Sequence, residues 1–115
     1  MQEHYMSLTK VPFEQIQKGE KSVEIRLYDE KRRLVQVGDI IYFSLVDDEK
    51  QVIKTKVLAL HRFASFAQLF STNLLSKGGF SGYTIEESIA CMREFYAREK
   101  EEKYGVLGIE IMIEE

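Results

Sequence analysis

Three ionisable side chains that could bind or transform a ligand lie close together in the sequence: Lys21, Glu24 and Arg26. Residues 22–28 alternate between polar and apolar types, which is typical of a β-strand. Glu24 and Arg26 are therefore expected on one face of that strand, with a carboxylate next to a guanidinium. Either these side chains contact a ligand, or they belong to a solvated strand whose charges neutralise one another. The alternation alone favours the second explanation.

A cluster of positive charge follows this strand at Lys31, Arg32 and Arg33. Residues 10–33 contain seven basic and five acidic residues, a local charge of +2, whereas the whole chain has a formal charge of -3. Such a patch suits a single-stranded or flipped base when an aromatic ring is nearby, because cations bind the phosphates and the ring stacks on the base. The candidate rings are Tyr28 and, from a later segment, Phe80 or Tyr83. Further cations that would extend the patch are Lys54, Lys56 and Arg62.

The composition argues against several other classes of protein. A pI near 5.5 does not suit a protein that coats nucleic acid non-specifically. One cysteine and two distant histidines provide no metal-ligand spacing, and the glycines at 78–79 belong to no nucleotide-binding motif, so neither a metal nor a cofactor is expected. The chain has no signal-like or membrane-spanning stretch, and we expect a cytoplasmic protein without membrane contact.

The rest of the chain predicts the elements that would position these residues. Apolar or alternating segments predict strands at 4–9, 22–28, 40–46, 51–60 and 106–113. Helices are predicted from Pro12 to Lys18, after Ser65, and from a capping box at Thr84 through to Lys103. The glycine-rich segment Gly78–Tyr83 breaks regular structure, and its two aromatic residues are suited to cover a pocket.

This order of elements predicts one domain over residues 1–115. It lacks the regular strand-helix-strand rhythm of a doubly wound parallel sheet. We therefore expect the α+β class, with a small, mostly antiparallel β-barrel flanked by two to three helices.

The motif Gly19-x-Lys21-x-x-Glu24-x-Arg26 resembles the ASCH domain family, a branch of the PUA-like superfold. The surrounding sequence is similar as well, with Pro12-Phe13-Glu14 before the motif, Gly38-Asp39 after it, and Tyr104-Gly105-Val106-Leu107-Gly108-Ile109 at the last strand. The resemblance spans nearly the whole chain and implies a PUA-like β-barrel. It also implies a cleft, lined by Lys21, Glu24 and Arg26, that binds RNA or a nucleoside- or nucleotide-like ligand.

We therefore expect a binding module that is non-catalytic or weakly catalytic. In this reading Lys21 and Arg26 contact phosphate or a base edge, and Glu24 orients Arg26 or accepts a hydrogen bond from an exocyclic amine. The cations Lys31, Arg32 and Arg33 would extend the electrostatic footprint of the cleft. A structural alternative stays open, in which Glu24 and Arg26 only pair with each other across the barrel mouth.

A catalytic alternative also follows from the resemblance. One ASCH branch consists of small amidohydrolases that remove the acetyl group from N4-acetylcytidine with a lysine, a threonine nucleophile and a glutamate. Lys21 matches that lysine, but Glu24 stands at the position of the threonine, and no carboxylate lies between Gly79 and Thr84, where the family has its glutamate. If the chain is a hydrolase, Lys21 would be the base and Glu24 the acid or the carboxylate that activates water.

Overall fold

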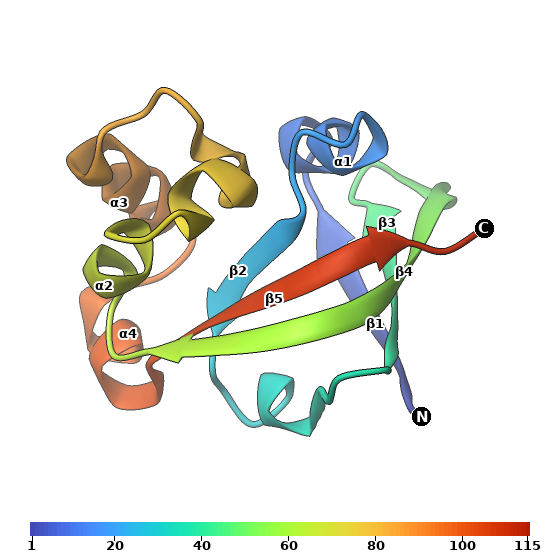
Figure 1. The fold of residues 1–115 in the computed structure, drawn as a ribbon, viewed down its shortest axis with the longest axis horizontal. Coiled ribbons are helices and arrows are strands. Elements are labelled where there is room, and N and C mark those ends of the chain that lie inside the picture. Colours follow the sequence, from blue (N-terminus) through green and yellow to red (C-terminus); the bar gives the residue numbers. More distant parts are fainter.

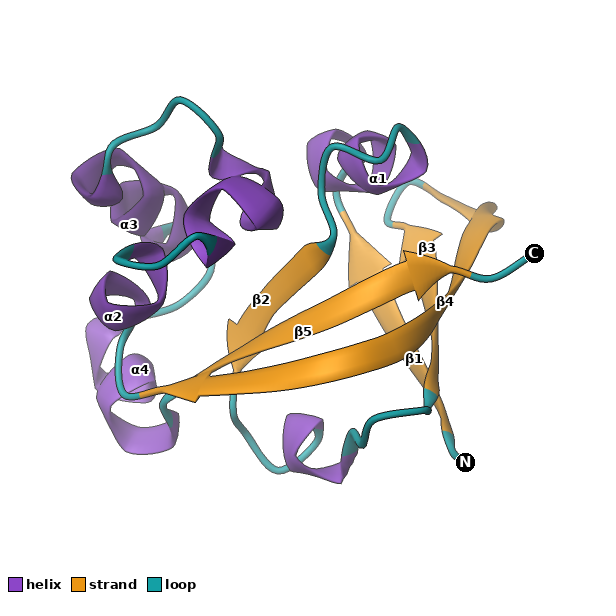
Figure 2. Ribbon diagram, in the orientation of Figure 1, coloured by secondary structure: helices purple, strands orange, loops and turns teal.

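The fold is a strongly curved sheet with helices packed beside it, as Figures 1 and 2 show for the computed structural model, which describes all 115 residues. The five strands are β1 (Glu3–Leu8), β2 (Val23–Leu27), β3 (Ile40–Leu45), β4 (Asp48–Phe63) and β5 (Val106–Ile113). Their order in the sheet is β1-β3-β4-β5-β2. Only β1 and β3 pair in parallel, and the other neighbours are antiparallel. The prediction of a mostly antiparallel, barrel-like α+β fold is confirmed.

The helices fall into two groups (Figure 1). Helix α1 (Lys10–Gln17) lies over one end of the curved sheet, while α2 (Phe66–Phe70), α3 (Ile85–Arg93) and α4 (Arg98–Tyr104) gather beside β2. Two short turns complete the fold, a 3-10 turn η1 (Arg32–Leu34) and a π-turn η2 (Ser76–Phe80). None of the helices is long and apolar enough to cross a membrane.

Strand β2 separates two hydrophobic cores. The larger core fills the curved sheet under α1 and includes Phe13 and Phe43. The smaller core lies between β2 and the helices, and it contains the apolar side chains that alternate along the strand, Val23, Ile25 and Leu27. The predicted apolar face of this strand is therefore confirmed, and Glu24 and Arg26 lie on the opposite face.

The helix predicted from residue 85 to 103 is wrong in its length, because it is interrupted between α3 and α4. Its start is confirmed, since Thr84 and Glu87 form the expected capping box. In one continuous helix Arg93 and Glu101 would be separated by about 12 Å along the axis. Their side chains instead form an ion pair of 2.5 Å, and Glu101 also accepts a 2.6 Å hydrogen bond from the backbone N–H of Phe66. These contacts of a buried carboxylate require the chain to turn back, and they give four α-helices where two to three were predicted.

Smaller differences concern the ends of elements. Helix α1 begins at Lys10, so Pro12 occupies its third position rather than its first. This costs no hydrogen bond, because the first four N–H groups of a helix have no partner within it. Gly19 has a φ of 77° and ends this region as predicted. The hairpin between β3 and β4 turns at residues 46–47, one to three residues earlier than expected.

Candidate functional site

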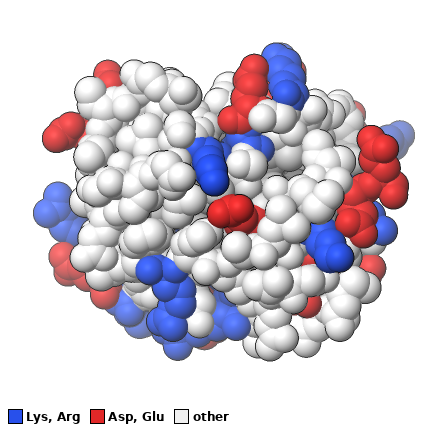
Figure 3. Space-filling view, in the orientation of Figure 1, with Lys and Arg blue, Asp and Glu red and all other residues white.

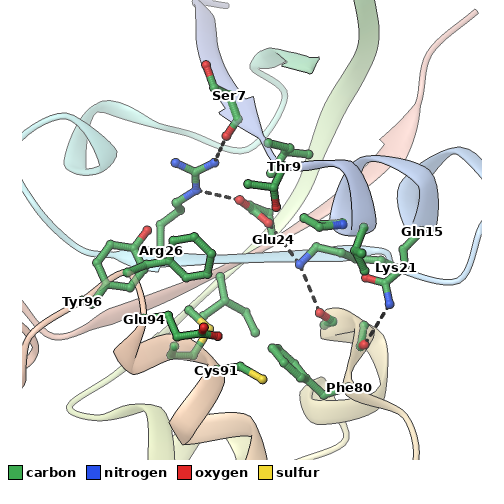
Figure 4. Close-up of a pocket in the computed structure, with 18 of the residues that line it drawn as sticks. Ser7, Thr9, Gln15, Lys21, Glu24, Arg26, Phe80, Cys91, Glu94 and Tyr96 are labelled. Carbon is green, nitrogen blue, oxygen red and sulfur yellow. Dashed lines mark hydrogen bonds and ion pairs between the residues drawn. The ribbon is translucent and has the colours of Figure 1, made fainter. Parts of the chain in front are cut away.

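A cavity of about 540 Å³ lies between the mouth of the curved sheet and α3. Its lining comes from five places in the chain: the junction of β1 and α1, strand β2 with the residues just before it, the turn between β3 and β4, the η2 segment with Tyr83, and the end of α3 with the residues after it (Figure 4). This volume lies within the range of pockets that hold small ligands, roughly 300–1,000 Å³. The cavity is therefore large enough for a nucleobase or a nucleoside.

The floor of the cavity is a connected row of Lys21, Glu24 and Arg26 (Figure 4). Lys21 Nζ lies 3.1 Å from Glu24 Oε1, and Arg26 Nε donates to Glu24 Oε2 at 2.6 Å. The side chains are only 7%, 5% and 13% exposed, respectively. The carboxylate thus lies between two cations, and all three side chains are mostly shielded from water.

The outer contacts of the row tie it to distant parts of the chain. Arg26 Nη2 donates to the backbone carbonyl of Ser7 at 2.9 Å, and Lys21 Nζ donates to that of Gly78 at 3.1 Å. Ser7 belongs to β1, which forms the opposite end of the sheet from β2. Arg26 therefore bridges the two unpaired edges of the sheet at the place where the cavity opens.

The ionisation of the floor reflects a balance between burial and charge. Burial alone would raise the pKa of Glu24, but the positive charges of Lys21 and Arg26 outweigh it and the pKa is lowered. Burial would likewise lower the pKa of Arg26, yet its pKa is raised because Glu24 favours the charged guanidinium. Burial raises the pKa of Tyr96, whose phenol lies near the same row. Glu24 is accordingly an ionised hydrogen-bond acceptor at neutral pH.

Aromatic side chains form the walls of the cavity, namely Phe80, Tyr83, Phe95 and Tyr96. Tyr83 and Phe95 are exposed at the rim, whereas Phe80 and Tyr96 also pack against the smaller core. The rings of Phe80 and Tyr83 pack edge to face, with 5.7 Å between their centroids. These rings provide flat apolar surfaces above a charged floor.

The wall formed by η2 is held in place by the floor and by α1. Besides the bond from Lys21, Gln15 Nε2 donates to the carbonyl of Gly79 at 3.1 Å. Gly79 has a φ of 92°, a conformation that favours glycine, and a Cβ on Gly78 would lie 2.7 Å from Ile25 Cδ1, so that side chain would have to move. The glycine-rich segment that we expected to cover a pocket lines this one.

The predicted cluster Lys31, Arg32 and Arg33 does not line the cavity. These residues lie in and beside η1, beyond the end of β2, where Figure 3 shows basic side chains gathered on the surface near α4. Arg32 pairs with Asp29 at 3.3 Å, and Lys31 donates to the carbonyl of Tyr5 at 3.1 Å. They are separate from the floor because the chain turns after Leu27.

The other residues considered for stacking or charge also lie outside the cavity. The ring of Tyr28 is covered by two guanidinium groups, with Arg62 4.0 Å and Arg33 5.1 Å from its centroid. Lys54 and Lys56 are exposed on β4 and do not line the cavity either. Of the proposed stacking residues, Phe80 and Tyr83 are therefore the two that line the cavity.

Several lining residues carried no signal in the sequence. Thr9 precedes α1 without a capping hydrogen bond from its side chain, and its hydroxyl faces the cavity near Glu24 (Figure 4). Phe95 and Tyr96 belong to the range that was predicted as one continuous helix, and in the structure they line the cavity from the segment between α3 and α4. No group of three or more His, Cys, Asp or Glu side chains is arranged to hold a metal ion.

Comparison with solved structures shows the same fold elsewhere. The crystal structure of hypothetical protein PH0355 has a TM-score of 0.87 and 37% identity, covering 97% of this chain and 99% of that one. The solution NMR structure of protein PF0455 from Pyrococcus furiosus has a TM-score of 0.76 and 38% identity, with 98% of both chains covered. An ASCH domain from Lactobacillus crispatus JV V101 shares the fold at 16% identity, with a TM-score of 0.63 over 95% of this chain and 79% of that one.

The family comparison covers almost the entire chain. No curated protein sequence matches this one. The family model described as ASCH domain matches residues 6–115, a range that contains the Gly19–Arg26 motif and every lining residue of the cavity. The resemblance seen in the motif is confirmed, and the chain belongs to the ASCH domain family.

Proposed function

We propose that this protein binds RNA or a nucleotide-like ligand in the cavity floored by Lys21, Glu24 and Arg26. The observation that carries the proposal is the placement of one ionised carboxylate and two cations at the bottom of a cavity with aromatic walls. A base inserted between the walls would stack on the rings and direct its polar edge to the floor. Recognition of unpaired bases commonly combines these two kinds of contact.

The arrangement of charge supports recognition of the polar edge of a base inside the cavity. The phosphates of the same ligand would be bound outside it. The floor carries two cations and one anion, and all three engage each other or backbone carbonyls. Phosphates of an RNA strand would instead follow exposed cations outside the cavity. Among the residues predicted for this role, Lys31 and Arg33 are exposed, as is the neighbouring Arg62.

Binding of a fluorescently labelled, short single-stranded RNA tests the proposal. We expect Arg26→Ala to weaken binding about tenfold or more, because a charged hydrogen-bond donor is lost from a shielded site. Lys54→Ala, which removes an exposed cation on β4, is the matched control and should change affinity less than about twofold. Affinity should also fall steeply as salt is added. Equal and negligible effects of the two substitutions would contradict the proposal.

A hydrolase acting on a modified nucleoside such as N4-acetylcytidine is the alternative function. The lowered pKa of Glu24 argues against a role as general acid, because an ionised carboxylate has no proton to donate, and it leaves Glu24 the role of the carboxylate that activates water. Incubation of the purified protein with N4-acetylcytidine decides between the two. Turnover that is abolished by both Lys21→Ala and Glu24→Ala would replace the binding proposal with a catalytic one.

A further inference from the structure

We infer that the cavity floor selects a base with an imide edge, a planar O=C–N(H)–C=O group such as the one that uracil presents. The inference rests on the proposed function and names the class of base that the same site would take. Its basis is the order in which hydrogen-bond donors and acceptors remain available along Lys21, Glu24 and Arg26.

Each residue of the floor keeps hydrogen-bonding capacity after its contacts within the protein are counted. A lysine ammonium has three donors, and Lys21 uses two, on Glu24 Oε1 and the Gly78 carbonyl. The Arg26 guanidinium has five N–H donors and uses two, on Glu24 Oε2 and the Ser7 carbonyl, which leaves one N–H on Nη2 and two on Nη1. Each oxygen of Glu24 forms an ion pair with one of the two cations. Further lone pairs on the carboxylate remain free to accept hydrogen bonds.

The order of these groups along the floor is donor, acceptor, donor. The carboxylate lies between the cations, with the Lys21 ammonium on its Oε1 side and the Arg26 guanidinium on its Oε2 side (Figure 4). The outer hydrogen bonds to the Gly78 and Ser7 carbonyls hold each cation on its own side of the carboxylate. A complementary ligand edge must present acceptor, donor, acceptor.

Among the common bases, uracil has this pattern on its pairing edge. Its O2 and O4 carbonyls would accept from the two cations, and its N3–H would donate to Glu24. Cytosine places the lone pair of its N3 opposite the carboxylate, and guanine places an amino group opposite one of the cations. Mismatches of this kind leave buried polar groups without a hydrogen-bond partner. Because such unpaired groups lower the affinity, the site can discriminate strongly between similar bases.

The ionisation of the floor supports the assignment. Because the two cations outweigh the effect of burial and lower the pKa of Glu24, the carboxylate acts only as an acceptor at neutral pH. At neutral pH it therefore has no proton with which to donate a hydrogen bond to the N3 of cytosine. The aromatic walls would contact the faces of any base alike, so the choice among bases falls to the floor.

Calorimetric titration of the intact protein with uridine, cytidine and 3-methyluridine tests the inference. We expect uridine to bind at least about tenfold more tightly than cytidine. This is the loss of affinity expected when one hydrogen bond to a charged group cannot form. The matched probe 3-methyluridine has a methyl group in place of the N3 hydrogen and should lose at least as much affinity. Cytidine or 3-methyluridine binding as tightly as uridine would overturn the inference.

A substitution at the acceptor position provides a second, independent test. Glu24→Gln keeps the shape of the side chain and supplies an amide N–H₂ that can donate to the N3 of cytidine, so the preference for uridine should shrink to less than about threefold or reverse. Glu110→Gln makes the same chemical change outside the cavity and should leave the preference intact. An unchanged preference in a folded Glu24→Gln variant would overturn the inference.

The failure of this inference is distinguishable from that of the proposed function. If all three nucleosides bind with similar affinity and Arg26→Ala weakens each of them, the cavity binds nucleosides without selecting an imide, and only the inference is overturned. If neither the nucleosides nor short RNA bind, both are overturned.

Discussion

Two of the three buried carboxylates in this protein, Glu24 and Asp39, are satisfied in different ways. Asp39 accepts hydrogen bonds from the backbone N–H groups of Gln2 and Gln36, both at 3.0 Å, and lies 2.8 Å from His4 Nε2. Glu24 has no backbone donor and relies on two cationic side chains. Asp39 does not line the large cavity, whereas Glu24 forms its floor.

The pKa of each carboxyl group is lowered, but the causes differ. For Asp39, burial alone would raise the pKa, and the hydrogen bonds from His4 and the two backbone amides outweigh it. For Glu24, burial is outweighed by the charges of Lys21 and Arg26. A carboxylate held by backbone donors fastens β1 to the turn before β3. A carboxylate held between two cations leaves charged donors beside it for a ligand.

Among the substitutions that test this contrast between Glu24 and Asp39, Glu24→Ala is expected to have the largest effect on stability and binding. Removing the carboxylate leaves two buried cations without a counter-charge, which should lower the free energy of unfolding by about 3–5 kcal/mol and abolish nucleoside binding. Urea denaturation and calorimetric titration measure the two effects. Replacing the whole row together, by Lys21→Met, Glu24→Leu and Arg26→Met, should restore most of the stability but no binding. A loss of stability below about 1 kcal/mol in Glu24→Ala would contradict our view of the row.

A smaller effect, confined to stability, is expected for Asp39→Ala. The substitution strips two buried backbone N–H groups and His4 of their acceptor, which should lower the free energy of unfolding by about 2–3 kcal/mol. Uridine affinity of the folded variant should equal that of the unchanged protein, as measured by titration well below the melting temperature. Weakened binding in a folded Asp39→Ala variant would show that the two carboxylates are coupled.

Acidification should affect both carboxylates in the same direction. Because each pKa is lower in the folded state, the unfolded chain binds protons more readily, and stability is lost as the pH falls. The loss should begin near the ordinary values, 4.5 for Glu24 and 3.8 for Asp39, and continue towards their lower folded values. It amounts to roughly 1.4 kcal/mol for each pH unit by which a pKa is lowered. Urea midpoints between pH 6 and 3 should show a shallower dependence in Glu24→Gln and in Asp39→Asn, and unchanged slopes would refute the assignment.

The smallest effect is expected at a third carboxylate, Glu110, which pairs with His61 in a half-exposed setting. Its Oε1 lies 2.8 Å from His61 Nε2, and the side chains of His61 and Glu110 are 34% and 26% exposed. Solvent screens such a pair, so Glu110→Gln should change the free energy of unfolding by no more than about 0.5 kcal/mol. Thermal or urea denaturation checks this value. A loss as large as that of Asp39→Ala would show that burial is not what separates the three carboxylates.

Local patterns in the sequence predicted much of the scaffold around the site. The alternation at 22–28 identified β2 and placed Glu24 and Arg26 on one face, and the capping box at Thr84 identified the start of α3. These features depend on neighbours within a few residues, through side-chain period and helix capping. The interruption before α4 was missed because its cause is the contact of Glu101 with Phe66, which is distant in sequence.

The same distinction between local and distant contacts applies to the residues of the candidate site. The motif brought Lys21, Glu24 and Arg26 together, whereas the charge of Lys31, Arg32 and Arg33 suggested a common site that the turn after β2 separates. Tyr28 was considered as a stacking residue on the basis of its position in the same strand, yet its ring is covered by Arg62 and Arg33. Position along the chain did not show that the lining aromatics would instead come from η2, from the segment that follows it and from the segment after α3.

The sequence by itself determined that one acid and two cations share a short segment around a strand, and that this strand belongs to a barrel-like fold of a recognisable family. Only the tertiary structure decided that they are buried, that Ser7 and Gly78 hold the two cations in place, and that a cavity with aromatic walls opens above them. The physical reason is that desolvation and hydrogen-bond satisfaction depend on every atom packed around a group. Ser7, Gly78 and the aromatic walls come from segments far from Glu24 in sequence.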